Sequence, residues 1–415
     1  MAHTLENERD VALSLLSAAA VRERAGEMLA LGREDALPHF RVDFTRLAAT
    51  ADYVANVIRT NYPDLRVPLH ARWRHFVFGG RDLWADIAAK VPWRDKAAQA
   101  RAAFDLAIVS VLLDAGAGPQ WQYRDAATGL TANRSEGLAL ASLRMFEAGL
   151  FSADARDPLR ADAKRLAALT AEDLVKGFRA GPANPLAGLE GRAALLARLG
   201  HAMLANPNVF AAADNARAGG LFDHLAQSTD GKNLPAPAIL RALLLHLGSI
   251  WQDRLTLGGI PLGDTWRNRA IKRGDASNGL MPVHKLSQWL SYSLIEPLLE
   301  AGITITDVDG LTGLAEYRNG GLFIDAGVLA LRDPDLARTP LPVDSELVVE
   351  WRALTVALLD KLLPLVRERL GVTARDFPLG ALLEGGTWAA GRKIAREKRP
   401  DGSPPLTIIS DGTVF

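Results

Sequence analysis

The chain has 415 residues, 48% of them hydrophobic, which is enough to bury a large core and too much for a disordered chain. Basic and acidic residues both number 48, so the basic excess typical of a nucleic-acid-binding protein is absent and a small-molecule partner is favoured. The absence of cysteine excludes disulfides, thiolate zinc sites and cysteine nucleophiles, and it fits a reducing cytosol.

The first residues, MAHTLENERDVAL, are polar and acidic and show no signal-peptide core. The longest apolar stretches, such as ALLLHLGSIW, are too short to span a bilayer. We therefore expect a cytoplasmic protein with no membrane partner. The sequence leaves the oligomeric state open, a homo-oligomer included.

Helical periodicity dominates the chain, with apolar residues three and four positions apart. Gly32 marks the end of the first expected helix, and Ser135 is the expected N-cap of the fourth. The expected helices lie within residues 6–32, 43–65, 93–118, 135–151, 190–206, 236–251, 283–302 and 344–371.

Strand signals are few. They occur at residues 303–308, 321–325 and 406–415, the last with an Asp-Gly hairpin signal. We predict a mainly α protein with a small β-sheet. Connectors rich in proline or glycine favour two helical subdomains that share one core, residues 1–185 and residues 186–415, the second containing the sheet.

The stretch ITDVDGLTGLAEYRNGGLFID, residues 305–325, concentrates acidic residues and glycines between two expected strands. A calcium-binding EF-hand loop is excluded, because Leu311 stands where the third oxygen ligand belongs. A phosphoribosyltransferase loop is a second interpretation: Asp307 and Asp309 would face ribose or Mg²⁺, and the Thr312-Gly313 amides would hold phosphate. Against it, these acids are not adjacent and the surrounding sequence is helical.

A third interpretation places the chemistry at Glu316. Cleavage of an N-glycosidic bond builds positive charge on the sugar, and a carboxylate beneath the ring stabilises that charge and orients water. Arg318 and Asn319 follow closely, and we expect Arg318 to lower the pKa of Glu316. The ordinary alternative is a surface ion pair at the start of a helix.

A row of polar side chains follows the expected helix at 283–302. His284, Gln288 and neighbouring serines lie three and four positions apart in an otherwise apolar sequence, which favours the wall of a pocket. Lys285 would meet a phosphate or orient a substrate oxygen, or else simply extend into solvent. Trp289 is either core or a surface on which a planar group stacks.

Cationic residues gather at three further places. Arg72, Arg74 and His75 stand among aromatic residues in LHARWRHFVFGGRDLW and could hold an anionic group. Arg134 precedes Ser135 at an expected helix start. In LEGGTWAAGRKIAREKR, residues 383–399, the glycines stand at an expected helix start before basic residues, which suits phosphate or a plain glycine turn.

The eight histidines form no HExxH or HxH pair, and no Walker loop, dinucleotide fingerprint or GxSxG elbow is present. We therefore expect neither a metal nor a cofactor.

Several of these motifs together resemble one family. HARWRHF, SVLLDAGAG, RSEGLALASLRMF, GDTWR, HKLSQWLSYSLIEPL, LTGLAEYRNGGLFIDAGVL, LEGGTWAAGR and SDGTVF are similar to the fourth protein of the fungal and bacterial uracil-catabolism (URC) pathway. This resemblance implies breakdown of uracil through a nucleotide or ribosylurea intermediate, with release of urea. Some members are labelled uracil phosphoribosyltransferases, which keeps that activity as an alternative.

A more distant resemblance concerns mechanism. Queuosine-salvage nucleosidases, similar to helix-hairpin-helix DNA glycosylases, carry a lysine-containing helix followed by a DYR motif whose aspartate serves glycosidic cleavage. Lys285 and LAEYRNG lie at a similar separation, so Glu316 would hold the place of that aspartate. Glutamate is one methylene longer, and Asn-Gly-Gly follows it here. The resemblance implies a helix-hairpin-helix glycosylase-like helical core.

We thus expect a metal-independent N-glycosidase that acts on a uracil-derived nucleotide or on ribosylurea, with or without a phosphate. Glu316 would stabilise the oxocarbenium ion, Lys285 would orient substrate, and Asp307 or Asp309 would contact ribose or water. A phosphoribosyltransferase and a non-enzymatic protein that binds uracil or a nucleotide are the alternatives.

Overall fold

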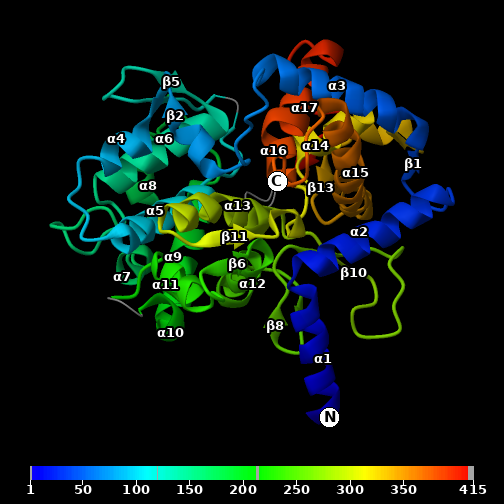
Figure 1. Cartoon of the computed structure of the whole chain (residues 1–415). Helices are drawn as coiled ribbons and strands as arrows, with labels where there is room; N and C mark the ends of the chain where they lie inside the picture. The colour runs from blue at the N-terminus through cyan, green and yellow to red at the C-terminus, as the bar shows by residue number, and fades with distance from the viewer. Residues whose placement is uncertain (1, 119, 212–214, 410–415) are drawn as a thin grey trace. The chain divides into compact units, whose positions relative to one another are not determined.

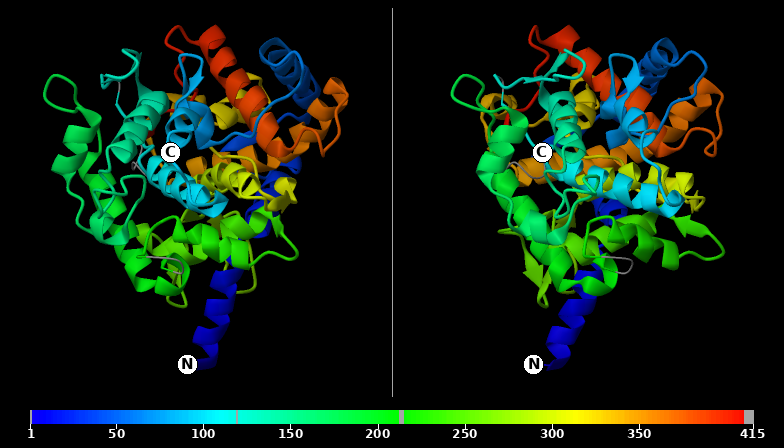
Figure 2. Two further views of the ribbon diagram at one scale, coloured as in Figure 1. Left: turned by 60° about the vertical axis from the view of Figure 1, so that its left-hand side comes forward. Right: turned by 90° about the vertical axis from the view of Figure 1, so that its left-hand side faces the viewer.

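The computed structural model describes residues 2–118, 120–211 and 215–409 (Figures 1 and 2). These residues are mainly helical and contain only two-stranded sheets, which confirms the predicted fold class. Among them no helix combines the length and the apolar character that a bilayer crossing demands. The likeness to helix-hairpin-helix glycosylases stays a prediction.

The chain forms two compact units, each assembled from segments far apart in the sequence. Unit 1 comprises Met1–His70, Asp253–Gln288 and Asp307–Phe415, and unit 2 comprises Ala71–Gln252 and Trp289–Thr306. Residues 185 and 186, where the sequence analysis divides the chain, both lie in unit 2. The compact units therefore do not follow that linear division.

Unit 1 is built around six helices of nine or more residues and several short elements. The helical segments are α1 (Ala2–Leu15), α2 (Ala18–Arg33), η1 (Phe44–Arg46), α3 (Leu47–Asn61), η4 (Val308–Gly310), α14 (Tyr317–Asp325), η5 (Pro334–Arg338), α15 (Glu346–Leu370), α16 (Leu379–Ala381), the π-helical η6 (Leu382–Trp388) and α17 (Ala389–Lys398). The paired strands are β1 (Phe40–Val42) with β12 (Leu329–Leu331), β7 (Thr256–Leu257) with β8 (Ile260–Pro261), β9 (Thr265–Arg267) with β10 (Leu280–Pro282), and β13 (Leu341–Pro342) with β14 (Ile408–Ile409).

Unit 2 is likewise helical, and it holds most of α13 (Lys285–Glu300), whose first four residues belong to unit 1. Its other helical segments are η2 (Arg72–Phe76), α4 (Leu83–Ala88), α5 (Lys96–Leu112), α6 (Arg134–Glu147), α7 (Ala163–Ala167), α8 (Ala171–Phe178), α9 (Leu189–Ala205), α10 (Pro207–Phe210), α11 (Gly220–Gln227), α12 (Ala236–Leu247) and η3 (Gly248–Ile250). The paired strands are β2 (Val77–Phe78) with β3 (Arg81–Asp82), β4 (Tyr123–Arg124) with β5 (Thr131–Ala132), and β6 (Asn233–Pro235) with β11 (Thr304–Thr306).

Local signals account for most of these helices, and three expectations need correction. The helix expected at 6–32 is two helices, because Ser17 adopts an extended conformation and its hydroxyl caps α2 by accepting the N–H of Ala20. The strand expected at 321–325 is the second half of α14. Ser135 lies inside α6, which begins one residue earlier.

The glycines at 385–386 also differ from expectation. They lie within the π-helical segment η6, which runs directly into α17, so no helix N-terminus is open there. Of the expected strands, 303–308 contains β11 and 406–415 contains β14. The hairpin signal at Asp411-Gly412 lies outside the described residues.

The long helix α15 forms the core of unit 1. It packs against α2, α3 and α14 (Figure 1), and most of its residues are buried. One of these is Glu350, whose Oε1 accepts the backbone N–H groups of His39 (3.2 Å) and Phe40 (2.9 Å) at the start of β1. Burial raises the pKa of Glu350 to about 7, although the two N–H donors act in the opposite direction.

Two glycines let helices of unit 1 approach closely. A Cβ at Gly320 of α14 would lie 2.7 Å from the Trp351 ring of α15, and one at Gly391 of α17 would lie 2.2 Å from the carbonyl oxygen of Arg318. Any larger residue would force these helices apart. The glycines of the 305–325 stretch therefore serve the packing of α14 as well as its turn.

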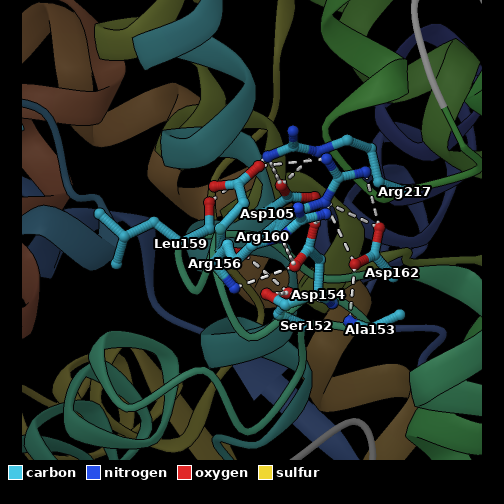
Figure 3. A network of polar contacts seen from close by, with 10 residues as sticks. Asp105, Ser152, Ala153, Asp154, Arg156, Leu159, Arg160, Asp162 and Arg217 are labelled. Carbon is cyan, nitrogen blue, oxygen red and sulfur yellow. Dashed lines mark hydrogen bonds and ion pairs between the residues drawn. The ribbon is translucent and has the colours of Figure 1, made fainter. Parts of the chain in front are cut away.

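In unit 2, α9 packs against α7 and α8 (Figure 2), and α5 supplies a largely buried core. Within that core, Asp105 is fully buried and forms an ion pair with Arg217 (Figure 3). Its other oxygen accepts the N–H of Gly219 at 2.5 Å. Burial raises the pKa of Asp105 to about 6, against the effect of Arg217. Arg160 and Asp162 form a neighbouring ion pair at 2.8 Å.

Glu350→Gln should change the pH dependence of stability. Because the folded pKa of Glu350 is about 7 and the unfolded value is about 4.3, the folded protein binds more protons between these pH values. The wild type should therefore lose up to about 3 kcal/mol of unfolding free energy as pH rises through this window, and the variant should not.

Urea unfolding at pH 5, 6, 7 and 8 measures this difference. The control is Glu346→Gln on the same helix, because the pKa of Glu346 is lowered, chiefly by its hydrogen bond with Arg269, and its titration lies below the window. Parallel pH profiles for the wild type and Glu350→Gln would contradict the assignment.

Candidate functional site

Glu316 is the N-cap of α14 and the centre of the candidate site. Its backbone is extended, and its carboxylate accepts two N–H groups of the first helical turn, Arg318 N to Oε2 at 2.7 Å and Asn319 N to Oε1 at 2.5 Å. The side chain is buried. Since each carboxylate oxygen can accept a second hydrogen bond, both keep a position for water or substrate while the group is held in one orientation.

The charge of Glu316 is set by opposing effects. Burial raises its pKa most strongly, the backbone N–H groups of Arg318 and Asn319 lower it, and the charges of Lys285 and His70 lower it further. The net pKa is raised. Arg318 thus lowers this pKa through its backbone N–H, as expected in direction, but burial outweighs this effect and the other favourable contacts.

The Arg318 side chain has another partner. Its guanidinium donates to the carbonyl oxygen of Gly402 at 2.8 Å and lies 5.0 Å from the Tyr317 ring, so only its backbone N–H contacts Glu316. Asn319 is buried and donates from Nδ2 to the carbonyl oxygen of Leu314 at 3.0 Å. Its Oδ1 has no hydrogen-bond partner among the described residues.

His70 brings a second carboxylate to the site. Its Nδ1 lies 2.6 Å from Glu384 Oε2, and its backbone N–H donates to the Gly380 carbonyl at 2.9 Å. Glu384 lies in the π-helical segment η6, a distortion of the kind that often accompanies functional sites. The ring of Trp388, from the end of the same segment, lies 6.0 Å from the His70 ring.

A buried ion pair positions Lys285 at the start of α13. Asp264 and Arg352 form a bidentate pair with both N–O distances at 2.8 Å, and Asp264 Oδ2 also accepts the Lys285 backbone N–H at 2.9 Å. Burial acts to raise the pKa of Asp264, but Arg352, Trp266 and the Lys285 N–H together hold it below its ordinary value. Arg352 Nε also reaches the Ala315 carbonyl, at 3.5 Å. The pair therefore connects the start of α13 with the residue before Glu316.

His284 and Gln288 hold the first turn of α13 in place. His284 has a left-handed backbone (φ 50°), is fully buried, and its Nε2 lies 3.0 Å from the Leu15 carbonyl. Burial is the main cause that lowers its pKa, so the ring is neutral at pH 7 and donates from Nε2. Gln288 Oε1 accepts the Thr312 N–H at 3.2 Å. Both side chains therefore have positioning contacts.

The two aspartates of the predicted phosphoribosyl loop have other surroundings. Asp309 Oδ2 pairs with Arg367 at 2.6 Å, and its Oδ1 accepts the Leu379 N–H at 2.7 Å, so this carboxylate connects α15 with α16. Asp307 is exposed and adopts a left-handed backbone, φ 50°.

Within unit 2 the structure brings Arg72, His75 and Trp289 together. The Trp289 ring lies 5.6 Å from the guanidinium of Arg72 and 5.8 Å from the His75 ring. Arg72 is fully buried and binds Ser110 Oγ (2.7 Å) and Asp114 (2.6 Å). Burial lowers the pKa of Arg72, partly offset by Asp114.

The remaining predicted cations of unit 2 lie elsewhere. Arg74 forms an ion pair with Glu296 of α13. Arg134 is exposed at the first position of α6, with a left-handed backbone.

Sequence reasoning missed several members of the site in unit 1. The residues that act on Glu316 or position its neighbours, which we call the Glu316 cluster, are Glu316, Lys285, His70, Glu384, Asp264 and Arg352. A usable signal existed for Arg352, because a charged residue inside the apolar run of α15 requires a buried partner. His70, Glu384 and Asp264 stand in motifs that the sequence analysis quoted without assigning them roles.

Comparisons with known proteins cover the whole site. A protein family described as "Protein of unknown function (DUF1688)" matches residues 14–415, which include the entire Glu316 cluster. Protein urg3 of Schizosaccharomyces pombe is 38% identical over 411 residues, covering 97% of this chain and 98% of that protein. Uracil catabolism protein 4 of Lachancea kluyveri is 38% identical over 415 residues, covering 91% of this chain and 92% of that protein.

Asp264→Asn should destabilise the protein strongly. The substitution leaves Arg352 buried without its counter-charge, which typically costs about 3–5 kcal/mol. The matched control is Glu346→Gln. It breaks an exposed bidentate pair with Arg269 at the first turn of α15, the helix that also carries Arg352. Surface pairs contribute little, so the control should unfold near the wild-type midpoint in urea at pH 7. Equal midpoints for both variants would contradict the role given to Asp264.

Proposed function

The chain belongs to the DUF1688 family, and we propose from this starting point that it is a uracil-catabolism enzyme that hydrolyses an N-ribosidic bond. The substrate would be a uracil-derived nucleotide or a ribosylurea, with or without a phosphate, and the leaving product would be urea or the base. The name of the Lachancea kluyveri relative supports a role in uracil catabolism. The observation that carries the reaction type is the buried carboxylate of Glu316, which accepts two backbone N–H groups and whose pKa Lys285 and His70 act to lower.

The chemistry required of such a site is stabilisation of a sugar cation. As the glycosidic bond breaks, the anomeric carbon gains positive charge, and a fixed carboxylate in a water-poor site stabilises it. The N–H groups of Arg318 and Asn319 hold the Glu316 carboxylate before substrate arrives. Its raised pKa brings its proton affinity closer to neutral pH, so the same group can take a proton from the attacking water.

His70 and Lys285 have complementary roles in this proposal. His70, hydrogen-bonded to Glu384, is placed to share a proton with that carboxylate while its own charge acts on Glu316. Lys285 would orient a substrate oxygen, since its backbone is fixed by Asp264. Asp309 is already engaged by Arg367 and the Leu379 N–H, so it is a less suitable contact for ribose.

Two alternatives from the sequence remain open to test. A phosphoribosyltransferase that uses Asp307 and Asp309 predicts a Mg²⁺-dependent thermal shift with phosphoribosyl pyrophosphate. A protein that only binds uracil or a nucleotide predicts binding without turnover. The engagement of Asp309 disfavours the first, because a ribose-binding carboxylate must be open to its ligand.

Glu316→Gln should abolish most of the activity. Loss of the charge beneath the sugar should reduce urea release from ribosylurea or its 5′-phosphate by about 100-fold or more. Glu350→Gln is the matched control, because Glu350 is also buried in unit 1 and also accepts two backbone N–H groups. Full activity in Glu316→Gln, or no urea from the wild type, would sink the mechanism. A chelator should leave the rate unchanged, since the proposed reaction is metal-independent.

Lys285→Met should shift the acidic limb of the rate profile. The ionised form of Glu316 is the active one, so the rate falls as pH drops through its pKa. Lys285 lowers that pKa, and its removal should move the limb of kcat to higher pH. The exposed Lys398→Met is the control and should leave the limb in place. A limb that stays fixed in Lys285→Met would show that this lysine does not act on the charge of Glu316.

A further inference from the structure

A depression of about 440 Å³ lies along one face of α17 in unit 1. Among the residues that the structure describes, its lining comes from the end of η6 and from α17. They are Trp388, Ala389, Arg392, Lys393, Arg396 and Glu397. The sequence of this segment, residues 383–399, suits either phosphate binding or a plain glycine turn.

The lining of this depression carries a net positive charge. The described lining contains Arg392, Lys393 and Arg396 and one acidic residue, Glu397, whose Oε1 lies 3.0 Å from the Lys393 ammonium. That pair is exposed on both sides and so holds its partners weakly. The Arg392 guanidinium lies 4.7 Å from the Trp388 ring, which keeps its planar group against an apolar wall. Guanidinium groups held in this way suit the oxygens of a phosphate.

The same tryptophan connects this depression with the Glu316 cluster. Trp388 lines the depression, and its ring lies 6.0 Å from the ring of His70, which hydrogen-bonds Glu384 and acts on the charge of Glu316. In addition, Gly391 brings the backbone of α17 against the Arg318 carbonyl, in the first turn of the helix that Glu316 caps. The basic face and the catalytic carboxylate therefore belong to adjoining elements of one unit.

We propose that the α17 depression binds the phosphate of a phosphorylated ribosyl substrate, with Arg392 and Arg396 as its principal contacts. This inference rests on the proposed hydrolase function and narrows its substrate class to the 5′-phosphorylated compounds. Trp388 would stand between the phosphate and the reacting sugar carbon. The free ribosyl compound lacks the group that these cations recognise and would be the poorer substrate.

A binding measurement tests this inference without any need for turnover. Calorimetric titration of the full chain would compare ribose 5-phosphate, ribose and inorganic phosphate at low and moderate salt. Ribose 5-phosphate should bind at least about tenfold more tightly than either fragment, because the sugar and the phosphate contact different parts of the site. Added salt should weaken its binding, since the cations of the depression are partly exposed.

Charge-removing variants locate the binding site. The double variant Arg392→Met/Arg396→Met should weaken ribose 5-phosphate about tenfold or more, the size expected when charge-assisted hydrogen bonds are lost. The single variant Arg396→Met, at an exposed position, serves as a second test. Lys398→Met is the matched control: it lies on the same helix, is exposed, and does not line the depression.

The outcomes separate this inference from the proposed reaction. Glu316→Gln should keep the binding of ribose 5-phosphate, so binding that depends on Arg396 supports the inference even if no urea is released. The inference is overturned if ribose 5-phosphate does not bind. Equal affinity for inorganic phosphate also overturns it, as does equal weakening by Arg396→Met and Lys398→Met.

Discussion

The buried ion pair of Asp264 and Arg352 is the interaction on which the candidate site depends. Both groups are withdrawn from water, and each makes a further contact with the backbone. Asp264 accepts the N–H of Lys285, and Arg352 reaches the carbonyl of Ala315. One pair of charges thereby sets where α13 begins and where the turn before Glu316 lies. A buried pair adds little to stability compared with well-packed apolar residues, so its presence here fits a positioning role.

Glu316 shows what this positioning achieves. A helix N-terminus favours an anion through its unpaired N–H groups and its dipole, whereas burial opposes the charge. At Glu316 burial prevails, and the pKa is raised despite two N–H donors and the charges of Lys285 and His70. A buried carboxyl group whose pKa is raised has a higher proton affinity than an exposed one. That property suits a group that must act first as an anion and then as a proton acceptor.

Sequence patterns predicted the helices well because the signals are local. The helix within 344–371 is bounded by Ser345, whose hydroxyl accepts the Val348 N–H, and by Gly371 in the left-handed conformation, as expected from capping chemistry. The segment 321–325 was misread as a strand because a short segment with three adjacent apolar residues, Leu322–Ile324, suits either structure. What decides for helix is tertiary: Gly320 packs against Trp351, which lies far along the chain.

The candidate site shows the same difference between what local signals predict and what only the folded chain decides. Glu316 and Lys285 could be singled out from their motifs, but the pairing of His70 with Glu384 spans 314 positions and that of Asp264 with Arg352 spans 88. No periodicity or local motif encodes such pairings, because they exist only once the segments of unit 1 have assembled. The ion pair of Asp309 with Arg367 could not be predicted for the same reason. Because of this pair and the bond from the Leu379 N–H, Asp309 connects α15 with α16, although the sequence suggested a ligand-binding residue.

Equal numbers of basic and acidic residues in the whole chain do not show how charge is distributed within it. The chain carries 48 basic and 48 acidic residues, which says only that no large excess exists over the whole surface. Locally, acids of unit 1 such as Asp264 and Asp309 are engaged by arginines at fixed positions. The described lining of the depression on α17 contains Arg392, Lys393 and Arg396 and one acidic residue, Glu397. Under this proposal, an anionic substrate approaching unit 1 would meet these basic residues next to Trp388, and neighbouring contacts lead from there through His70 to Glu316.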